Sequence, residues 1–158
     1  MHSYIFQMGS KPISSDDYNI PDLYYDDSKI YADHIGWAVE DEEERHECIK
    51  RLADRLGDLF TLDGDVLVYK GKDAMHKFLQ DWTDAIKSKT EELEADNVLC
   101  KLSNIIDCAK TSHKFIHQRF YIDEWNDWAG AFRDLVDYLG ELKEGDRIYI
   151  GSIIDYHY

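Results

Sequence analysis

The sequence is poor in cysteine. Its three cysteines, Cys48, Cys100 and Cys108, include no CxxC pair, and an odd number at low density is typical of reduced thiols in a cytoplasmic protein. Cys48 and Cys100 have apolar neighbours within helical patterns, and free cysteine usually behaves as a small hydrophobic residue. We therefore expect a cytoplasmic protein with buried thiols and without a disulfide framework.

Long hydrophobic runs and basic residues are also missing. The apolar runs are short, whereas a membrane-spanning helix needs about 20 apolar residues in succession. The first residues lack the basic and apolar regions of a secretory signal, so we expect the mature chain to begin at Met1. Only 18 Lys and Arg oppose 33 Asp and Glu, a net charge of -15. This charge argues against nucleic acid or an anionic membrane as a direct partner.

Local motifs of known chemistry are absent as well. Gly9-Ser10-Lys11 is not preceded by the spaced glycine of a phosphate-binding loop, and the sequence contains no GxGxxG. It has no GxSxG elbow either. Nothing local identifies a reaction, so we expect a protein that is not an enzyme and uses no cofactor.

The sequence does contain enough apolar and aromatic residues, 44% and 13% of the chain, to form one folded domain over residues 1–158. Its periodicities predict helices at 41–56, 72–95, 97–111 and 123–139, and strands at 3–8, the later half of 30–39, a 59–69 hairpin, 114–122 and 147–156. A hairpin mixed with alternating helices favours the α+β class. We expect a single mixed, mainly antiparallel sheet of about five to six strands packed by about four helices.

Histidine and cysteine provide two arrangements to consider for metal binding. His46, Glu47 and Cys48 are consecutive, but consecutive residues of a helix point about 100° apart and cannot share one ion. His113 and His117 would lie on one face of a strand about 13 Å apart, at a rise of about 3.3 Å per residue. That separation is too large for one ion, so the sequence predicts no metal site.

One polar strand face is an alternative site. Alternation along the 114–122 strand places His117, Arg119 and Tyr121 on the same face. These side chains could line a polar pocket in a small enzyme or ligand-binding domain. A solvated sheet face is the simpler interpretation, because any strand buried on one side shows this alternation.

The acidic residues concentrate between residues 16 and 47. Twelve Asp and Glu there, against Lys29 and Arg45, contribute -10 of the net charge of -15. The acids at 40–44 complement the dipole at a helix N-terminus. The better candidate for a partner-binding surface is therefore the preceding tyrosine-rich segment, with Asp16, Asp17, Tyr18, Asp22, Tyr24, Tyr25, Asp26, Asp27, Tyr31 and Asp33.

Tyrosine combined with carboxylates suits the recognition of a basic protein. Tyrosine supplies contact area at low entropic cost, and carboxylates pair with Lys and Arg. Our leading hypothesis is a non-enzymatic interaction protein, which as a nucleic-acid mimic or an immunity-type protein would inhibit a nucleic-acid-binding protein. The acidic segment could instead only keep the protein in solution. A further alternative is a self-associating structural subunit, since 11 Tyr and 4 Trp can leave aromatic surface exposed.

Overall fold

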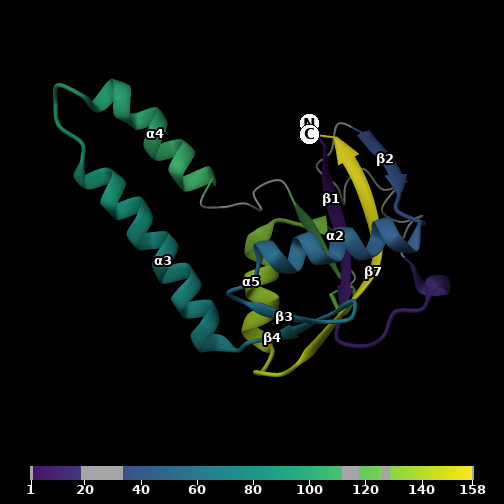
Figure 1. Cartoon of the computed structure of the whole chain (residues 1–158). Coiled ribbons are helices and arrows are strands. Elements are labelled where there is room, and N and C mark those ends of the chain that lie inside the picture. The colour runs from purple at the N-terminus through teal and green to yellow at the C-terminus, as the bar shows by residue number, and fades with distance from the viewer. Residues whose placement is uncertain (1, 19–33, 112–117, 126–128, 158) are drawn as a thin grey trace.

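The computed structural model describes residues 2–18, 34–111, 118–125 and 129–157, and for 34–36 and 107–111 it describes the backbone alone (Figure 1). In these residues the chain forms a mixed, open sheet of seven strands, six of them in its main order, together with four α-helices. This arrangement confirms the predicted α+β class. The predicted surface residues between 22 and 33, and His117, lie outside the described residues.

The last strand lies at the centre of the sheet. The strands follow the order β3-β4-β7-β1-β5-β6, and β2 pairs with β7 outside this order. β1 and β5 are parallel, and the other pairs are antiparallel. Their bounds are β1 His2–Gly9, β2 His34–Ala38, β3 Phe60–Asp63, β4 Val66–Tyr69, β5 Arg119–Ile122, β6 Ala129–Gly130 and β7 Arg147–His157.

Two helices build the hydrophobic core against the sheet. α2 (Glu42–Arg55) buries the face that carries Ile49 and Leu52, and α5 (Phe132–Glu141) buries Leu135 and Leu139. Both helices are amphipathic, so burying one apolar stripe of each is what their sequence pattern predicts. This packing brings the first turn of α2 beside β7, where the side chain of Arg45 reaches the backbone of the strand.

The other two helices extend away from the sheet. α3 (Lys72–Glu91) and α4 (Val98–Thr111) form a hairpin that projects from the body of the molecule (Figure 1). α3 has no buried residue, and the side chain of Leu99 on α4 is 87% exposed. Both helices were predicted. Among their described residues, Met75 and Phe78 near the start of α3 are partly buried against the core, and the rest of the two apolar stripes lies outside it. None of the described helices combines the length and apolarity needed to span a bilayer.

The helix predicted at 123–139 begins later than expected. α5 starts at Phe132, and the short strand β6 precedes it. Asp123 does not cap this helix: its backbone N–H donates to the carbonyl of Met8, and Asp134 Oδ2 accepts from Ala131 N at 2.7 Å instead. Trp125 falls within the range predicted as helix, but it lies outside α5 and is 37% exposed.

The two described cysteine side chains differ. Cys48 is buried under the sheet, and burial raises the pKa of its thiol. This confirms the expected buried thiol. Cys100 is exposed on α4, so the same expectation was wrong there, because the helix that carries it is not packed on the core.

Candidate functional site

One edge of β7 is shared by two strands that do not meet. β4 pairs with Arg147 to Tyr149, and β2 pairs with the stretch from Ile154 to His157. Directly after β2, Val39 N donates to the carbonyl of Ile153 at 2.8 Å, and the register of the described strands gives residues 150–152 no partner from either β2 or β4. Buried backbone carbonyls in such a gap need other donors, and a side chain supplies them here.

A β-bulge lies at the same place, on the other edge of β7. The register pairs Phe6 with Ile153 and Met8 with Ile150. Gln7 of β1 therefore faces two residues of β7, Gly151 and Ser152, which is the definition of a bulge. A bulge leaves backbone groups unpaired, and the side chain of Gln7 accepts a hydrogen bond from one of them, the backbone N–H of Ser152.

Gln7 is fully buried and its amide is used at both ends. Its Oε1 accepts hydrogen bonds from Ser152 N at 2.9 Å and Ser152 Oγ at 3.0 Å. Its Nε2 donates to the carbonyl of Asp17 at 3.2 Å and to Asp123 Oδ1 at 2.9 Å. The short 3₁₀ helix η1 (Ser15–Asp17) and the residue after β5 are thereby fixed to the bulge.

Arg45 fills the gap on the opposite edge. Its guanidinium donates to the carbonyls of Gly151 and Ile150, and its Cζ lies 5.2 Å from the ring centroid of Tyr18. α2 places Arg45 in its first turn, after Asp41 caps the helix by accepting from Glu44 N at 2.9 Å. The one arginine of the acidic stretch is therefore used to complete the sheet.

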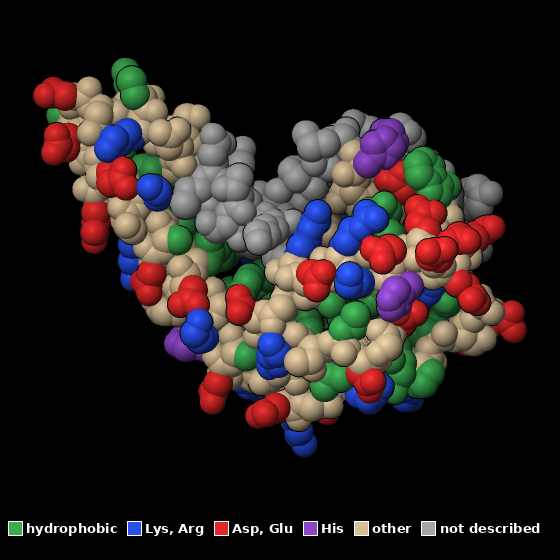
Figure 2. All heavy atoms as spheres, viewed as in Figure 1, with side chains coloured by type: hydrophobic (Ala, Val, Ile, Leu, Met, Phe, Trp, Pro, Cys, Tyr) green, Lys and Arg blue, Asp and Glu red, His purple; other side chains and the backbone are tan. Residues whose placement is uncertain are grey.

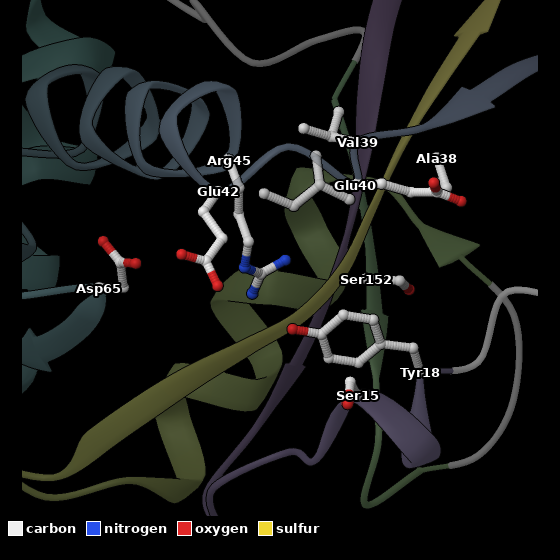
Figure 3. A pocket seen from close by; sticks show the side chains of 10 residues that line it. Ser15, Tyr18, Ala38, Val39, Glu40, Glu42, Arg45, Asp65 and Ser152 are labelled. Carbon is white, nitrogen blue, oxygen red and sulfur yellow. The ribbon is translucent and has the colours of Figure 1, made fainter.

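A cavity of about 670 Å³ opens beside these groups. β2, η1, the first turn of α2, the β3–β4 turn and β7 all contribute to its wall (Figure 3). The lining residues are Ser15, Tyr18, Ala38, Val39, Glu40, Glu42, Arg45, Asp65, Ser152 and Ile153. The cavity exists because β2 and β4 leave the middle of β7 uncovered.

Three carboxylates line this cavity. Glu42 and Asp65 lie on one side of Arg45, and Glu40 lies on the opposite side (Figure 3). Asp65 Oδ1 is 2.6 Å from His46 Nδ1, whereas Glu40 and Glu42 form no ion pair with any residue that the structure describes. Three carboxylates against the single guanidinium of Arg45 give the lining of the cavity an excess of negative charge.

The acidic character continues outside the cavity. Figure 2 shows Asp and Glu side chains gathered on the face that carries α2. The described acids of this neighbourhood are all exposed: Asp16, Asp17, Glu40, Asp41, Glu42, Glu43, Glu44, Glu47 and Asp65. Such a surface attracts cations and basic proteins over distances of roughly a Debye length, about 8–10 Å.

The structure describes three residues of the predicted partner-binding surface. Asp16 and Asp17 are exposed in η1 and contribute to the acidic face, and half-buried Tyr18 lines the cavity. The remaining members lie outside the described residues: Asp22, Tyr24, Tyr25, Asp26, Asp27, Tyr31 and Asp33. The described part therefore joins the start of the predicted surface to the cavity.

The polar strand face predicted at His117, Arg119 and Tyr121 is wrong at Tyr121. This side chain is fully buried, and Arg119 is half-buried. β5 lies between β1 and β6, and its residues Phe120, Tyr121 and Ile122 are all buried. Because both faces of this strand are covered, alternation along it does not separate a solvent face from a core face.

Sequence reasoning missed the two residues that organise the cavity, Gln7 and Arg45. The sequence places Gln7 in the strand predicted at 3–8, and it shows Arg45 as one of two basic residues in the acidic stretch. A single arginine in a run of glutamates at a helix start is a weak signal of a specific role. The carboxylates of Glu40 and Glu42 were assigned to the helix dipole alone, although both also line the cavity.

Metal-ligating side chains come together elsewhere. Of the consecutive residues considered in the sequence, His46 is exposed and Cys48 is buried, so they lie on different sides of α2. Among the described residues, the group of three that could hold an ion is His2, Asp155 and His157. It was not anticipated from the sequence, because its members are distant along the chain.

Comparison with known proteins provides no assignment. No protein-family model matches the chain, and no significant match was found among curated proteins or solved structures.

Proposed function

We propose that this chain is a non-enzymatic protein-binding module that takes a basic partner into the cavity beside Arg45 and onto the acidic face around it. One observation carries the proposal: the cavity has three lining carboxylates, and its arginine is engaged with backbone carbonyls. A cationic side chain that enters the cavity would meet Glu42 and Asp65 without displacing an existing Lys or Arg ion pair of the described residues.

The size of the cavity supports the insertion of a side chain. Pockets for small ligands are about 300–1,000 Å³, and this cavity of about 670 Å³ has room for a Lys or Arg side chain with its neighbours. The surrounding carboxylates would accelerate encounter with a basic surface and make association weaken as salt rises.

Proteins that bind nucleic acid are the partner class we propose. Their surfaces carry the Lys and Arg that neutralise phosphate, and an array of carboxylates competes for the same groups. The chain would then act as an inhibitor, either as a nucleic-acid mimic or as an immunity-type protein. We place this activity in the cytoplasm, where Cys48 would remain a thiol.

Removing the cavity carboxylates should weaken the binding of a basic peptide. We expect Glu40→Gln/Glu42→Gln/Asp65→Asn to lower the affinity for a fluorescein-labelled Arg- and Lys-rich peptide by about tenfold, because partly exposed ion pairs contribute about 0.2–1 kcal/mol each. Fluorescence anisotropy at low and physiological salt measures this change. The loss should shrink as salt increases.

The matched control carries the same charge change far from the cavity. Glu91→Gln/Glu94→Gln/Asp96→Asn removes three exposed carboxylates at the end of α3 and in the turn before α4, and its affinity should stay close to that of the parent protein. Equal losses in both triple variants would reject a cavity-specific site. Duplex DNA should displace the bound peptide or a basic test protein. If it does not, the proposal that the chain inhibits nucleic-acid-binding proteins is rejected, whereas the proposal that it binds a basic partner is not affected.

Self-association is a second candidate function, favoured by the exposed apolar residues of α4. Val98, Leu99, Leu102 and Ile106 are all exposed, and positions 99, 102 and 106 share one helical face. We expect the mass measured by light scattering to rise with protein concentration, and Leu99→Glu/Leu102→Glu to remain monomeric. Ser103→Glu/Asn104→Glu adds the same charge at exposed polar positions. A parent protein that is monomeric at every concentration would exclude this role.

A further inference from the structure

The described ends of the chain meet at one end of the sheet. β1 begins at His2 and β7 ends at His157, and the two histidines are direct register partners (Figure 1). Asp155 lies two residues before His157 on β7, and alternate residues of a strand share a face. The register also pairs His34 of β2 with His157 from the other side. Strand pairing therefore places three potential ligands, His2, Asp155 and His157, on one face.

The distances within this group are short. His2 Nδ1 lies 2.8 Å from Asp155 Oδ2 and 3.2 Å from Oδ1. The rings of His2 and His157 are 3.8 Å apart at their centroids, inclined at 63°. Each of the three residues offers one ligand atom within 4.8 Å of the others. Ligand atoms around a zinc ion lie about 2.0–2.2 Å from the metal, so small rotamer changes would bring the three atoms onto one ion.

The burial of Asp155 indicates that a cation suits this place. Asp155 is 2% exposed, and among the described residues no Lys or Arg pairs with it. A buried carboxylate is costly unless a cation or strong hydrogen bonds compensate it. The side chain of His2 is 57% exposed, so an ion could reach the carboxylate from solvent. The tilted ring of Trp37, 6.0 Å from that of His2, flanks the approach.

The ligand types select the kind of ion. Two imidazoles with one carboxylate suit first-row divalent transition metals, whereas Ca²⁺ and Mg²⁺ prefer oxygen ligands. Three protein ligands leave at least one coordination position for water or for a group from a partner. We infer that His2, Asp155 and His157 form a binding site for a divalent first-row transition metal ion such as Zn²⁺, which would clamp β1 to β7.

Cobalt and zinc binding to the tag-free chain tests this inference. After treatment with a chelator, the protein should bind one equivalent of Co²⁺ with a visible d–d absorption band, and Zn²⁺ should displace it. We expect His2→Gln and His157→Gln each to weaken Zn²⁺ binding by at least about 10–100-fold, the loss seen when even the groups supporting metal ligands are removed. Bound Zn²⁺ should also raise the unfolding temperature of the parent protein.

The controls use histidines at other exposed positions. His46→Gln and His76→Gln are on α2 and α3, and both should bind Zn²⁺ like the parent protein. Far-UV circular dichroism should show that each histidine variant is folded. Asp155→Asn would remove the third ligand, but Asp155 is buried and this variant could fail to fold. The test therefore depends on His2 and His157, which are not core residues. Equal Zn²⁺ affinity in the site variants and the parent, or equal losses in all four histidine variants, would overturn the site. The site variants should bind the basic peptide like the parent, which separates this inference from the proposed function.

Discussion

Replacing Gly151 with alanine should destabilise the fold by about 2–6 kcal/mol. A Cβ at this position would lie 2.4 Å from Gln7 Oε1 and 2.6 Å from Gln7 Cδ. The amide of Gln7 cannot move aside cheaply, because it is buried and holds hydrogen bonds to Ser152, Asp17 and Asp123. The cost therefore combines overpacking, about 1–3 kcal/mol, with the loss of buried hydrogen bonds, about 1–3 kcal/mol. Urea unfolding measures the change.

Gly140 provides the matched control for Gly151. A Cβ there would meet no atom within 4 Å, and Gly140 lies within α5. Gly140→Ala should therefore leave the stability unchanged or raise it by about 0.5–1 kcal/mol. In a Gln7→Ala background the Gln7 side-chain atoms that the new Cβ would meet are absent, so Gly151→Ala should lower the free energy of unfolding much less there. An equal cost in both backgrounds would show that Gln7 is not the reason for glycine at this position.

Arg45→Met should also cost about 2–4 kcal/mol. It removes two hydrogen bonds from a charged donor to the carbonyls of Gly151 and Ile150, and a stacking contact with Tyr18. Hydrogen bonds to charged groups contribute about 1.5–3 kcal/mol each, and water that enters the cavity should recover part of this. The free energy of unfolding, measured in urea, reports the loss.

The control for Arg45 lies on the same helix. Arg55 is exposed and near the end of α2, so Arg55→Met should change the stability by no more than about 0.5 kcal/mol. Arg45→Lys keeps the charge but lacks the planar fork that reaches two carbonyls, and it should recover only part of the stability. If Arg45→Met is no more damaging than Arg55→Met, the gap in the β7 edge does not depend on the guanidinium.

Features determined by neighbours along the chain were predictable from the sequence. The helix expected at 41–56 is α2, Glu42–Arg55, with Asp41 as its cap. The hairpin expected at 59–69 pairs β3 with β4, and Gly64 at the turn has a φ of 61°. Capping and positive φ are properties of a few adjacent residues, so periodicity and turn chemistry are sufficient to locate them.

The cavity could not be predicted in the same way, because it depends on long-range pairing. The bulge requires knowing that Phe6 faces Ile153 and Met8 faces Ile150, and the gap requires knowing that β2 and β4 share one edge of β7. No local pattern encodes either pairing. Without these two pairings, nothing in the sequence indicates a specific structural role for Arg45 or Gly151.

The histidine site illustrates the same limit. Spacing along one strand predicts that His113 and His117, which lie outside the described residues, would be about 13 Å apart. It gives no information about His2 and His157, which are adjacent only because the first and last described strands pair. The error at Tyr121 has a related cause, since the burial of a strand face depends on what covers it.

The central position of β7 has a consequence for how the chain folds during synthesis. β7 follows every other described strand along the chain, and it supplies the pairing edges for β1, β2 and β4. Until it emerges, these strands have no partner at the middle of the sheet, and α2 and α5 have no complete surface to cover. Pairing of residues so distant along the chain is slow, and the growing chain therefore exposes apolar strands until β7 has been made.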